Sequence, residues 1–363
     1  MRGLGSRRMP RGGRLVIVSD HVDGRSRSAV AAVRALAEAG YRPVVTVTGT
    51  PSSAAASRHC ASLLRTPAVG TPGFSEAVDR LLDEGAALVA ASDAVLVALH
   101  RPGAALVDKA LLAKRAAAAG LSVPATREFF SAALVLEEAA DLDYPIVVKP
   151  AVKTAPTEVA RRVDGPAELP AALEPLTGPI IVQPFSPKAM RAVCGVIADD
   201  RLVAAVHQRY LRIWPPDCGT ASAAVTTLPD RELEERLPAL LTGHVGVFQV
   251  QLVGDQVIDI NPRAYGSLPL AVAAGANLPA IACRIEHEEP APGIVRGRPG
   301  VRYRWLEGDM RRLLHDARAG VLTPGAVGRA LLPRLGAAHS IESLWDPGPF
   351  LVRLAAVAKS RRA

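Results

Sequence analysis

The stretch over residues 247–270 constrains the fold and chemistry of this chain more than any other. Its sequence, VFQVQLVGDQVIDINPRAYGSLPL, alternates apolar and polar residues around a central Gly-Asp pair, which predicts a β-hairpin. Asp259, Asn261 and Arg263 stand at alternate positions and so share one side of the second strand. Gln251 on the first strand can face the same space. Carboxylate and amide oxygens suit Mg2+, and a neighbouring arginine suits phosphate, so the stretch indicates a metal–nucleotide site.

The first part of the chain predicts a parallel β-sheet. Residues 14–19 (RLVIVS) form a continuous apolar run, as expected of a strand that is covered on both faces. A helical pattern over residues 28–39 ends at a glycine, and a second apolar run follows over 42–47. This spacing predicts a right-handed βαβ unit, so we expect a Rossmann-like domain over residues 14–105. The first turn lacks the pattern Gly-x-Gly-x-x-Gly, which disfavours a dinucleotide site and an NAD-dependent enzyme.

Two later strands end in polar residues. Residues 144–150 (YPIVVKP) place Lys149 at the end of a buried strand, where its charge requires an anionic partner. The loop that follows has no glycine but contains Lys153, a second cation that could cover a phosphate. A further apolar run over residues 180–185 ends in Gln-Pro-Phe. Strands of this kind are consistent with an α+β unit that follows the first domain.

The motif Asp-Ile-Asn-Pro-Arg resembles the metal-binding signature of the ATP-grasp superfamily, Glu-x-Asn-Pro-Arg. With a glutamine on the preceding strand, it is similar to the large subunit of carbamoyl-phosphate synthetase. The resemblance implies that Gln251, Asp259 and Asn261 bind Mg2+, with Mn2+ as an alternative. It also implies that Arg263 contacts the transferred phosphate. Asp259 is one methylene shorter than the glutamate of the family, which would loosen the metal geometry.

The same resemblance implies contacts to the nucleotide. Lys149 would contact the phosphates, and Lys153 lies in a loop that covers them and is rich in glycine in many relatives. The strand that ends in Gln183, Pro184 and Phe185 stands where backbone groups of relatives bind adenine. Proline keeps its carbonyl as an acceptor, and the Phe185 N–H is the expected donor to the ring.

The side of the site that receives the acceptor substrate has weaker signals. Arg209 and Arg212 leave a predicted hairpin strand three residues apart, so they could bind a substrate carboxylate or remain as surface charge. Gly266 and Ser267 begin a helix of small residues whose free N–H groups suit an anion. The resemblance places them beside the acceptor substrate.

A helix is predicted over residues 230–241. Its exposed face is expected to carry Glu232, Glu234 and Glu235, and we give it no catalytic part.

Composition narrows the classes of partner. The net charge is +8, but aromatic residues are only 4% and do not alternate with the basic ones, so small anionic substrates explain the charge better than nucleic acid. The four cysteines lack Cys-x-x-Cys spacing, which speaks against a zinc site and fits a reducing cytoplasm. No charge-free apolar run is long enough for a bilayer, so a membrane partner is not expected.

These observations predict an α/β and α+β protein. We expect a disordered basic tail over residues 1–13, the Rossmann-like domain, a two-lobed ATP-grasp domain over 106–288 and a helical C-terminal extension over 289–363. The expected activity is ATP-dependent joining of a small-molecule carboxylate to an amine through an acyl-phosphate, with ATP and Mg2+ as cofactors and a homodimer compatible with the sequence. The alternative is an ATP-binding protein of this fold with lost or weak ligase activity.

Overall fold

The computed structural model describes most of the chain, namely residues 14–20, 26–49, 52–153, 155, 157–288, 293–331 and 336–360. The expected basic tail over residues 1–13 lies outside the described residues, and so does most of the turn after the first strand. Four free cysteines are present, and none is disulfide-bonded. Within the described residues, no helix is both long and apolar enough to cross a bilayer.

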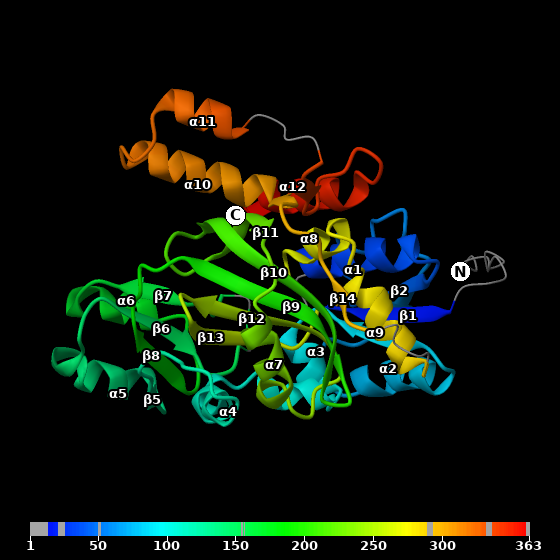
Figure 1. The fold of residues 1–363 in the computed structure, drawn as a ribbon, viewed down its shortest axis with the longest axis horizontal. Coiled ribbons are helices and arrows are strands. Elements are labelled where there is room, and N and C mark those ends of the chain that lie inside the picture. Colours follow the sequence, from blue (N-terminus) through cyan, green and yellow to red (C-terminus); the bar gives the residue numbers. More distant parts are fainter. Residues whose placement is uncertain are drawn as a thin grey trace.

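The N-terminal domain is built on a parallel sheet of four strands in the order β3-β2-β1-β4 (Figure 1). Alternate residues of β1 are buried on opposite faces: Val16 and Val18 pack in the core that contains α1, and Ile17 packs with α2 and α3. This explains why the strand is an uninterrupted apolar run. The elements are β1 (Leu15–Ser19), α1 (Arg27–Glu38), β2 (Arg42–Val47), β3 (Ser62–Arg65), α2 (Phe74–Asp83), β4 (Ala87–Ala90) and α3 (Asp93–Ala98).

A small antiparallel lobe follows, with strand order β5-β8-β6-β7. Its core joins Val148 of β6 and Val182 of β8 to apolar residues of two short helices. The lobe is reached through a short 3-10 helix, η2 (Lys109–Leu111), which runs into α4 (Leu112–Ala118). Its elements are β5 (Arg127–Phe129), α5 (Ala132–Glu137), β6 (Ile146–Pro150), β7 (Arg161–Val163), α6 (Leu169–Leu173) and β8 (Ile180–Pro184).

The large sheet of eight strands lies between the small lobe and the N-terminal domain (Figure 1). It contains two predicted hairpins, β9–β10 and β12–β13, and the first turns at Asp199 and Asp200, both with positive φ. Helices α4 and α7 pack on one face, and α8 and α9 pack on the other, beside the N-terminal domain. These elements are β9 (Met190–Ala198), β10 (Arg201–Trp214), β11 (Thr220–Thr226), α7 (Arg231–Leu240), β12 (Gly246–Val253), β13 (Gln256–Asn261), α8 (Leu268–Ala273) and α9 (Leu278–Glu286).

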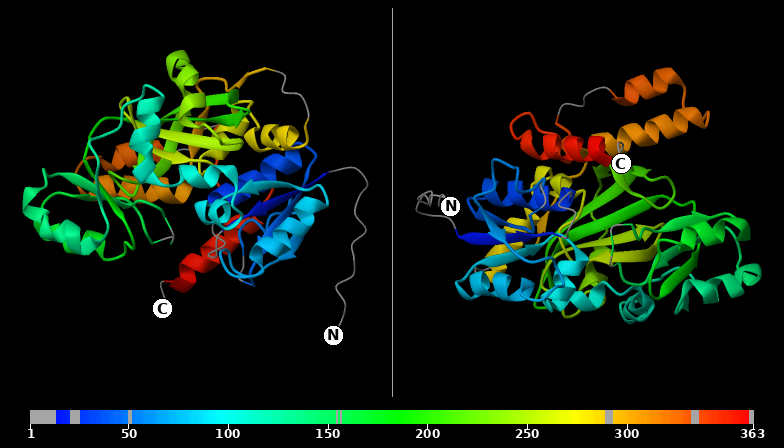
Figure 2. Two further views of the ribbon diagram at one scale, coloured as in Figure 1. Left: turned by 90° about the horizontal axis from the view of Figure 1, so that it is seen from below. Right: turned by 180° about the vertical axis from the view of Figure 1, so that it is seen from behind.

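The C-terminal segment is only partly the helical extension that was expected. Strands β14 (Val295–Arg296) and β15 (Arg302–Arg304) pair with β10 and β11, and β16 (Ala338–His339) pairs with β15, so the segment completes the large sheet. Apolar and β-branched residues are sparse in these short strands, which is why they gave no sequence signal. Helices α10 (Leu306–Arg318), α11 (Pro324–Leu331) and α12 (Gly348–Ser360) gather on one side of the molecule (Figures 1 and 2).

Candidate functional site

A cavity of about 290 Å³ lies where the small lobe, the β12–β13 hairpin and the N-terminal domain meet. Every site residue expected from the sequence lines it, except Arg209 and Arg212. The residues brought together are Lys149, Lys153, Gln183, Pro184, Phe185, Gln251, Asp259, Asn261, Arg263, Gly266 and Ser267. Residues from widely separated parts of the chain, such as Arg27, Asp93 and Lys109, complete the wall.

The hairpin register puts the predicted metal ligands side by side. Gln251 is paired with Asp259 across the two strands, and Gln249 is paired with Asn261. The Gln251 side-chain nitrogen donates to the hydroxyl of Tyr210 at 2.9 Å, which leaves its carbonyl oxygen as the ligand atom. Tyr210 and Gln249 also line the cavity but were not predicted from the sequence. Gln249 could have been predicted, because it stands two residues before Gln251 and so faces the same side of the strand.

The donor set fits Mg2+ that arrives with a nucleotide. Asp259 supplies the carboxylate, and one of its oxygens lies 3.5 Å from the Lys109 ammonium. No cluster of three or more His, Cys, Asp and Glu side chains suited to a metal occurs among the described residues. Mg2+ commonly binds through one or two carboxylates and takes its other ligands from phosphates and water. One carboxylate with two amide oxygens meets that requirement, whereas a closed protein metal centre would not be satisfied.

Arg263 is held rigidly by the N-terminal domain. Its Nε and Nη2 donate to the two oxygens of Asp93 at 2.7 and 3.2 Å, Nη2 also donates to Asn261 Oδ1 at 2.8 Å, and Nη1 donates to the Ala264 carbonyl at 3.0 Å. These contacts use four of the five N–H donors of a guanidinium. Arg263 is therefore held in place as an ion pair with Asp93, and one of its N–H groups is left for the phosphate contact expected from the resemblance.

Asp93 was not identified from the sequence. Burial would raise the pKa of its carboxyl, but the Arg263 guanidinium, and then Lys109 and Lys153, outweigh burial and lower that pKa. Asp93 therefore stays charged as the counter-ion of Arg263. It begins α3 just after β4, and the carboxyl ends of parallel strands are where functional side chains gather in such sheets. This position is the signal that could have found it.

Two of the three lysines that line the cavity, Lys149 and Lys153, have lowered pKa values. Lys149 is buried on β6, and its ammonium donates to the carbonyl of Ile258 at 2.8 Å. Burial, with a smaller contribution from Lys109, lowers the pKa of Lys149 to about 8 although Asp259 opposes the shift. Burial and then the charge of Arg263 lower the pKa of Lys153 as well. A bound polyanion would raise both pKa values again.

Gln183, Pro184 and Phe185, the residues expected at the adenine end, line the cavity. Gln183 donates to the hydroxyl of Thr126 at 2.8 Å, so its amide stabilises the small lobe. The Phe185 N–H donates to the carbonyl of Pro145 at 2.9 Å, so the donor role expected for it is wrong. The pairing of β8 with β6 ends at Pro184, and the hydrogen bond from Phe185 to Pro145 follows directly after it; the sequence does not specify that register.

The structure does not bring Arg209 and Arg212 to the cavity. The pairing of β10 with β11 shifts at a β-bulge between Tyr210 and Arg212, and such a bulge turns the following side chains to a new direction. Arg212 donates through Nε and Nη2 to the two oxygens of the fully buried Asp309, at 2.6 and 2.9 Å. Arg209 is exposed and lines a separate groove. Arg212 therefore donates its pair of hydrogen bonds to a carboxylate of α10, and not to a substrate carboxylate.

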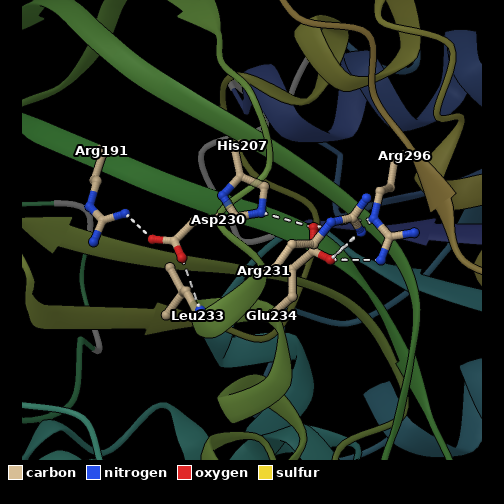
Figure 3. A network of polar contacts seen from close by, with 7 residues as sticks. All are labelled: Arg191, His207, Asp230, Arg231, Leu233, Glu234 and Arg296. Carbon is tan, nitrogen blue, oxygen red and sulfur yellow. Dashed lines mark hydrogen bonds and ion pairs between the residues drawn. The ribbon is translucent and has the colours of Figure 1, made fainter.

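A buried polar network lies near Arg209, and it corrects one prediction for α7 (Figure 3). Glu234 was expected on the exposed face but is only 4% exposed. Its carboxylate accepts from Arg296 of β14 at 2.7 Å and from Arg231 at 3.0 Å, and it lies 3.2 Å from the ring of His207 on β10. Glu234 thereby ties α7 to β10 and β14. The helical period alone cannot show this, because the partners come from other elements.

No family model matches this chain, and no curated protein sequence is detectably similar to it. Solved structures, in contrast, are similar over most of the chain. An L-amino acid ligase from Bacillus licheniformis shares 15% identity with a TM-score of 0.54, covering 77% of this chain and 75% of its own.

Two further solved structures extend the likeness. Carboxyaminoimidazole ribonucleotide synthase from Aspergillus clavatus, solved with ATP, shares 18% identity with a TM-score of 0.60 and covers 79% of this chain and 80% of its own. The biotin carboxylase domain of the 2-oxoglutarate carboxylase of Hydrogenobacter thermophilus, solved with MgADP and bicarbonate, shares 12% identity with a TM-score of 0.54, covering 80% and 73%. The chain thus shares the fold of these three enzymes, at 12–18% sequence identity.

Proposed function

We propose that this protein is an ATP-dependent ligase that joins a carboxylate to an amine or a similar nucleophile and releases ADP and phosphate. One observation carries the proposal: a single cavity is lined by Lys149 of β6, by Asp259 of β13 and by Arg263, which follows β13. Cations beside a metal-binding carboxylate are what transfer of a phosphoryl group needs. The likeness to ligases and carboxylases solved with ATP or MgADP supports the same reaction class.

The chain's own residues position the nucleotide. Lys149 and Lys153 would bind the phosphate chain, and Pro184 would supply a carbonyl acceptor at the adenine end. Asp259 and the amide oxygens of Gln251 and Asn261 would hold Mg2+, which neutralises phosphate charge when bound. Lys109, 3.5 Å from Asp259, balances that carboxylate before the nucleotide arrives.

The reaction follows from positioning and charge. A carboxylate oxygen of the substrate attacks the γ-phosphorus, the bond from that phosphorus to the bridging oxygen breaks, and ADP leaves. The amine then attacks the acyl carbon, phosphate leaves, and the amine loses a proton. Arg263, whose charge is balanced by Asp93, would offer its remaining N–H to the group in transfer, and Lys149 and Lys153 would supply the net positive charge. A catalytic base is not required for the second step, because the acyl-phosphate is already activated.

The competing interpretation is an ATP-binding protein with lost or weak ligase activity. Three departures from the family pattern motivate it. The loop after Lys149 has no glycine, Asp259 replaces a glutamate, and Pro184 has no backbone N–H. The intact set of Lys149, Asp259 and Arg263 in one cavity favours the enzyme.

Release of ADP from MgATP tests the proposal, measured against a panel of amino acids and small carboxylates supplied singly and in pairs. We expect at least one pair to stimulate release and to give an amide product by mass spectrometry. Tight MgATP binding without stimulation by any pair would favour the binding protein instead. Failure to bind MgATP would contradict both.

A further inference from the structure

Arg27 is a guanidinium in the cavity wall whose partners are all neutral. It begins α1, and its Nη2 donates to the Thr220 hydroxyl at 2.8 Å while Nη1 donates to the Tyr303 hydroxyl at 3.1 Å. Its Cζ lies 3.8 Å from the centre of the Trp305 ring. Among the residues that the structure describes, Arg27 pairs with no carboxylate, and its two hydrogen bonds leave Nε and further N–H groups for a ligand.

Other partly buried arginines of the molecule are neutralised by acids. Arg263 pairs with Asp93, Arg212 pairs with Asp309, and Arg34 pairs with Asp346. A partly buried charge without a counter-ion is unfavourable unless a ligand completes it. Arg27 differs from these arginines in lining the cavity without an acid partner among the described residues.

The local packing fixes the guanidinium beside the reaction centre. A Cβ atom added to Gly266 would lie 2.8 Å from Arg27 Nη2, so the guanidinium packs closely against this glycine. Tyr303 donates to the Gly266 carbonyl at 2.9 Å and accepts from Arg27, which links the two. Gly266 is three residues beyond Arg263. Arg27 therefore stands at the end of the cavity that the acceptor substrate would occupy.

We propose that Arg27 binds a carboxylate of the acceptor substrate that is not phosphorylated and remains free in the product. A carboxylate that accepts two hydrogen bonds from a guanidinium has much of its negative charge neutralised, so it is a weaker nucleophile toward phosphorus. One guanidinium among hydroxyl groups balances the single charge of a carboxylate better than the double charge of a phosphate ester. The proposal rests on the proposed ligase function and names its substrate class: an amino acid as the amine, or a dicarboxylate as the acid.

The test compares carboxylates with their neutral carboxamides. The probes are glycine, L-alanine, L-glutamate and succinate, each beside its carboxamide, with glycerol 3-phosphate as the phosphate ester. Binding is measured by calorimetry in the presence of Mg2+ and a non-hydrolysable ATP analogue, and ADP release is measured with MgATP. The free carboxylate in the product is checked by mass spectrometry, which also separates the amino-acid source from the dicarboxylate source.

For the wild-type protein we expect at least one carboxylate to bind about 10–100-fold more tightly than its carboxamide, as for hydrogen bonds to charged groups. Arg27→Gln should remove that preference and leave affinity for the ATP analogue within about twofold. Arg27→Lys should restore it only in part, because lysine lacks the planar pair of donors. The matched control is Arg353→Gln, which alters another guanidinium near the Trp305 ring that does not line the cavity.

The preference for the charged ligand is a readout that a purely structural role of Arg27 would not change. An Arg27→Gln protein that keeps the wild-type preference overturns the proposal. A wild-type protein that binds the ATP analogue but prefers no carboxylate over its amide, or prefers the phosphate ester, also overturns it. If the wild-type protein does not bind the ATP analogue, the proposed ligase function itself is overturned.

Discussion

At the scale of single residues, the cavity places one carboxylate among several cations. Asp259 lies beside Lys109, and Arg263 is neutralised by Asp93, so the remaining positive charge is available to phosphates. The type and spacing of Asp259, Asn261 and Arg263 were predictable because strand alternation is a local rule. Asp93 and Arg27 were not, because they reach the site only through the packing of the N-terminal domain.

Replacing the metal-binding carboxylate gives the first prediction. Asp259→Asn should abolish Mg2+-dependent ATP turnover and leave the unfolding midpoint near that of the wild type, because the change removes the only acid of the proposed ligand set. Asp259→Glu should stay active with a changed preference between Mg2+ and Mn2+. Asp255→Asn, in the turn of the same hairpin and 94% exposed, is the control. Full turnover by Asp259→Asn would remove the metal site from this position.

Lys149 gives a prediction that depends on pH. Because burial lowers its pKa to about 8, its positive charge is lost as the pH rises through that value. Affinity for ATP should therefore begin to fall near pH 8, and Lys149→Ala should lack this fall. At pH 7 the variant should bind ATP and ADP about 10–100-fold more weakly, with AMP much less affected. Lys114→Ala, an exposed lysine on α4, is the control; equal losses for ATP, ADP and AMP would count against a phosphate contact.

At the scale of elements, the hairpins could be predicted from the sequence more accurately than the partners of the side chains on each strand. The β12–β13 register followed from alternation, whereas the bulge after Tyr210 redirects Arg212 toward α10. A bulge is set by pairing with a neighbouring strand and leaves no local signature here. The buried position of Glu234 has the same origin, since Arg296 and His207 belong to other strands.

The Glu234 network should contribute to stability. Glu234→Gln should lower the free energy of unfolding by about 1.5–3 kcal/mol, because it weakens hydrogen bonds from a buried carboxylate to arginines that are 31% and 56% exposed. Burial alone would raise the pKa of Glu234, but Arg296 and His207 lower it below its ordinary value. The carboxylate therefore stabilises the fold above about pH 4.3, its unfolded pKa, and this contribution is lost as the pH falls further. Urea unfolding at pH 7 and pH 4 measures both effects.

Glu235→Gln is the matched control for that experiment. Glu235 is the next residue on α7 and is exposed, so the change should alter stability by less than about 0.5 kcal/mol. Equal effects of the two substitutions would mean that the network in Figure 3 does not stabilise the fold.

At the scale of the whole molecule, the C-terminal segment connects the large sheet to the N-terminal domain. Asp346, only 2% exposed, accepts from Arg34 Nε at 2.8 Å, from the Ser57 hydroxyl at 2.7 Å and from the Arg58 N–H at 2.9 Å. These partners lie about 290–310 residues away in sequence, so local patterns could not reveal the connection.

Asp346→Asn should therefore destabilise the protein by about 3 kcal/mol without changing ATP affinity, since it leaves Arg34 without its counter-ion away from the cavity. Urea unfolding and ATP titration measure the two quantities. Asp83→Asn, an exposed change on α2, is the control. Unchanged stability in Asp346→Asn would show that the segment is held by other contacts.

The central claim is that this cavity phosphorylates a carboxylate with ATP. Hydroxylamine tests it most directly, because it captures an acyl-phosphate as a stable hydroxamate. With MgATP, hydroxylamine and the panel of amino acids and small carboxylates, the wild-type protein should form a hydroxamate from at least one carboxylate, in amounts equal to the ADP released, and Asp259→Asn should form none. Acceptor-stimulated ADP release without any hydroxamate, or equal yields from both proteins, would contradict the account.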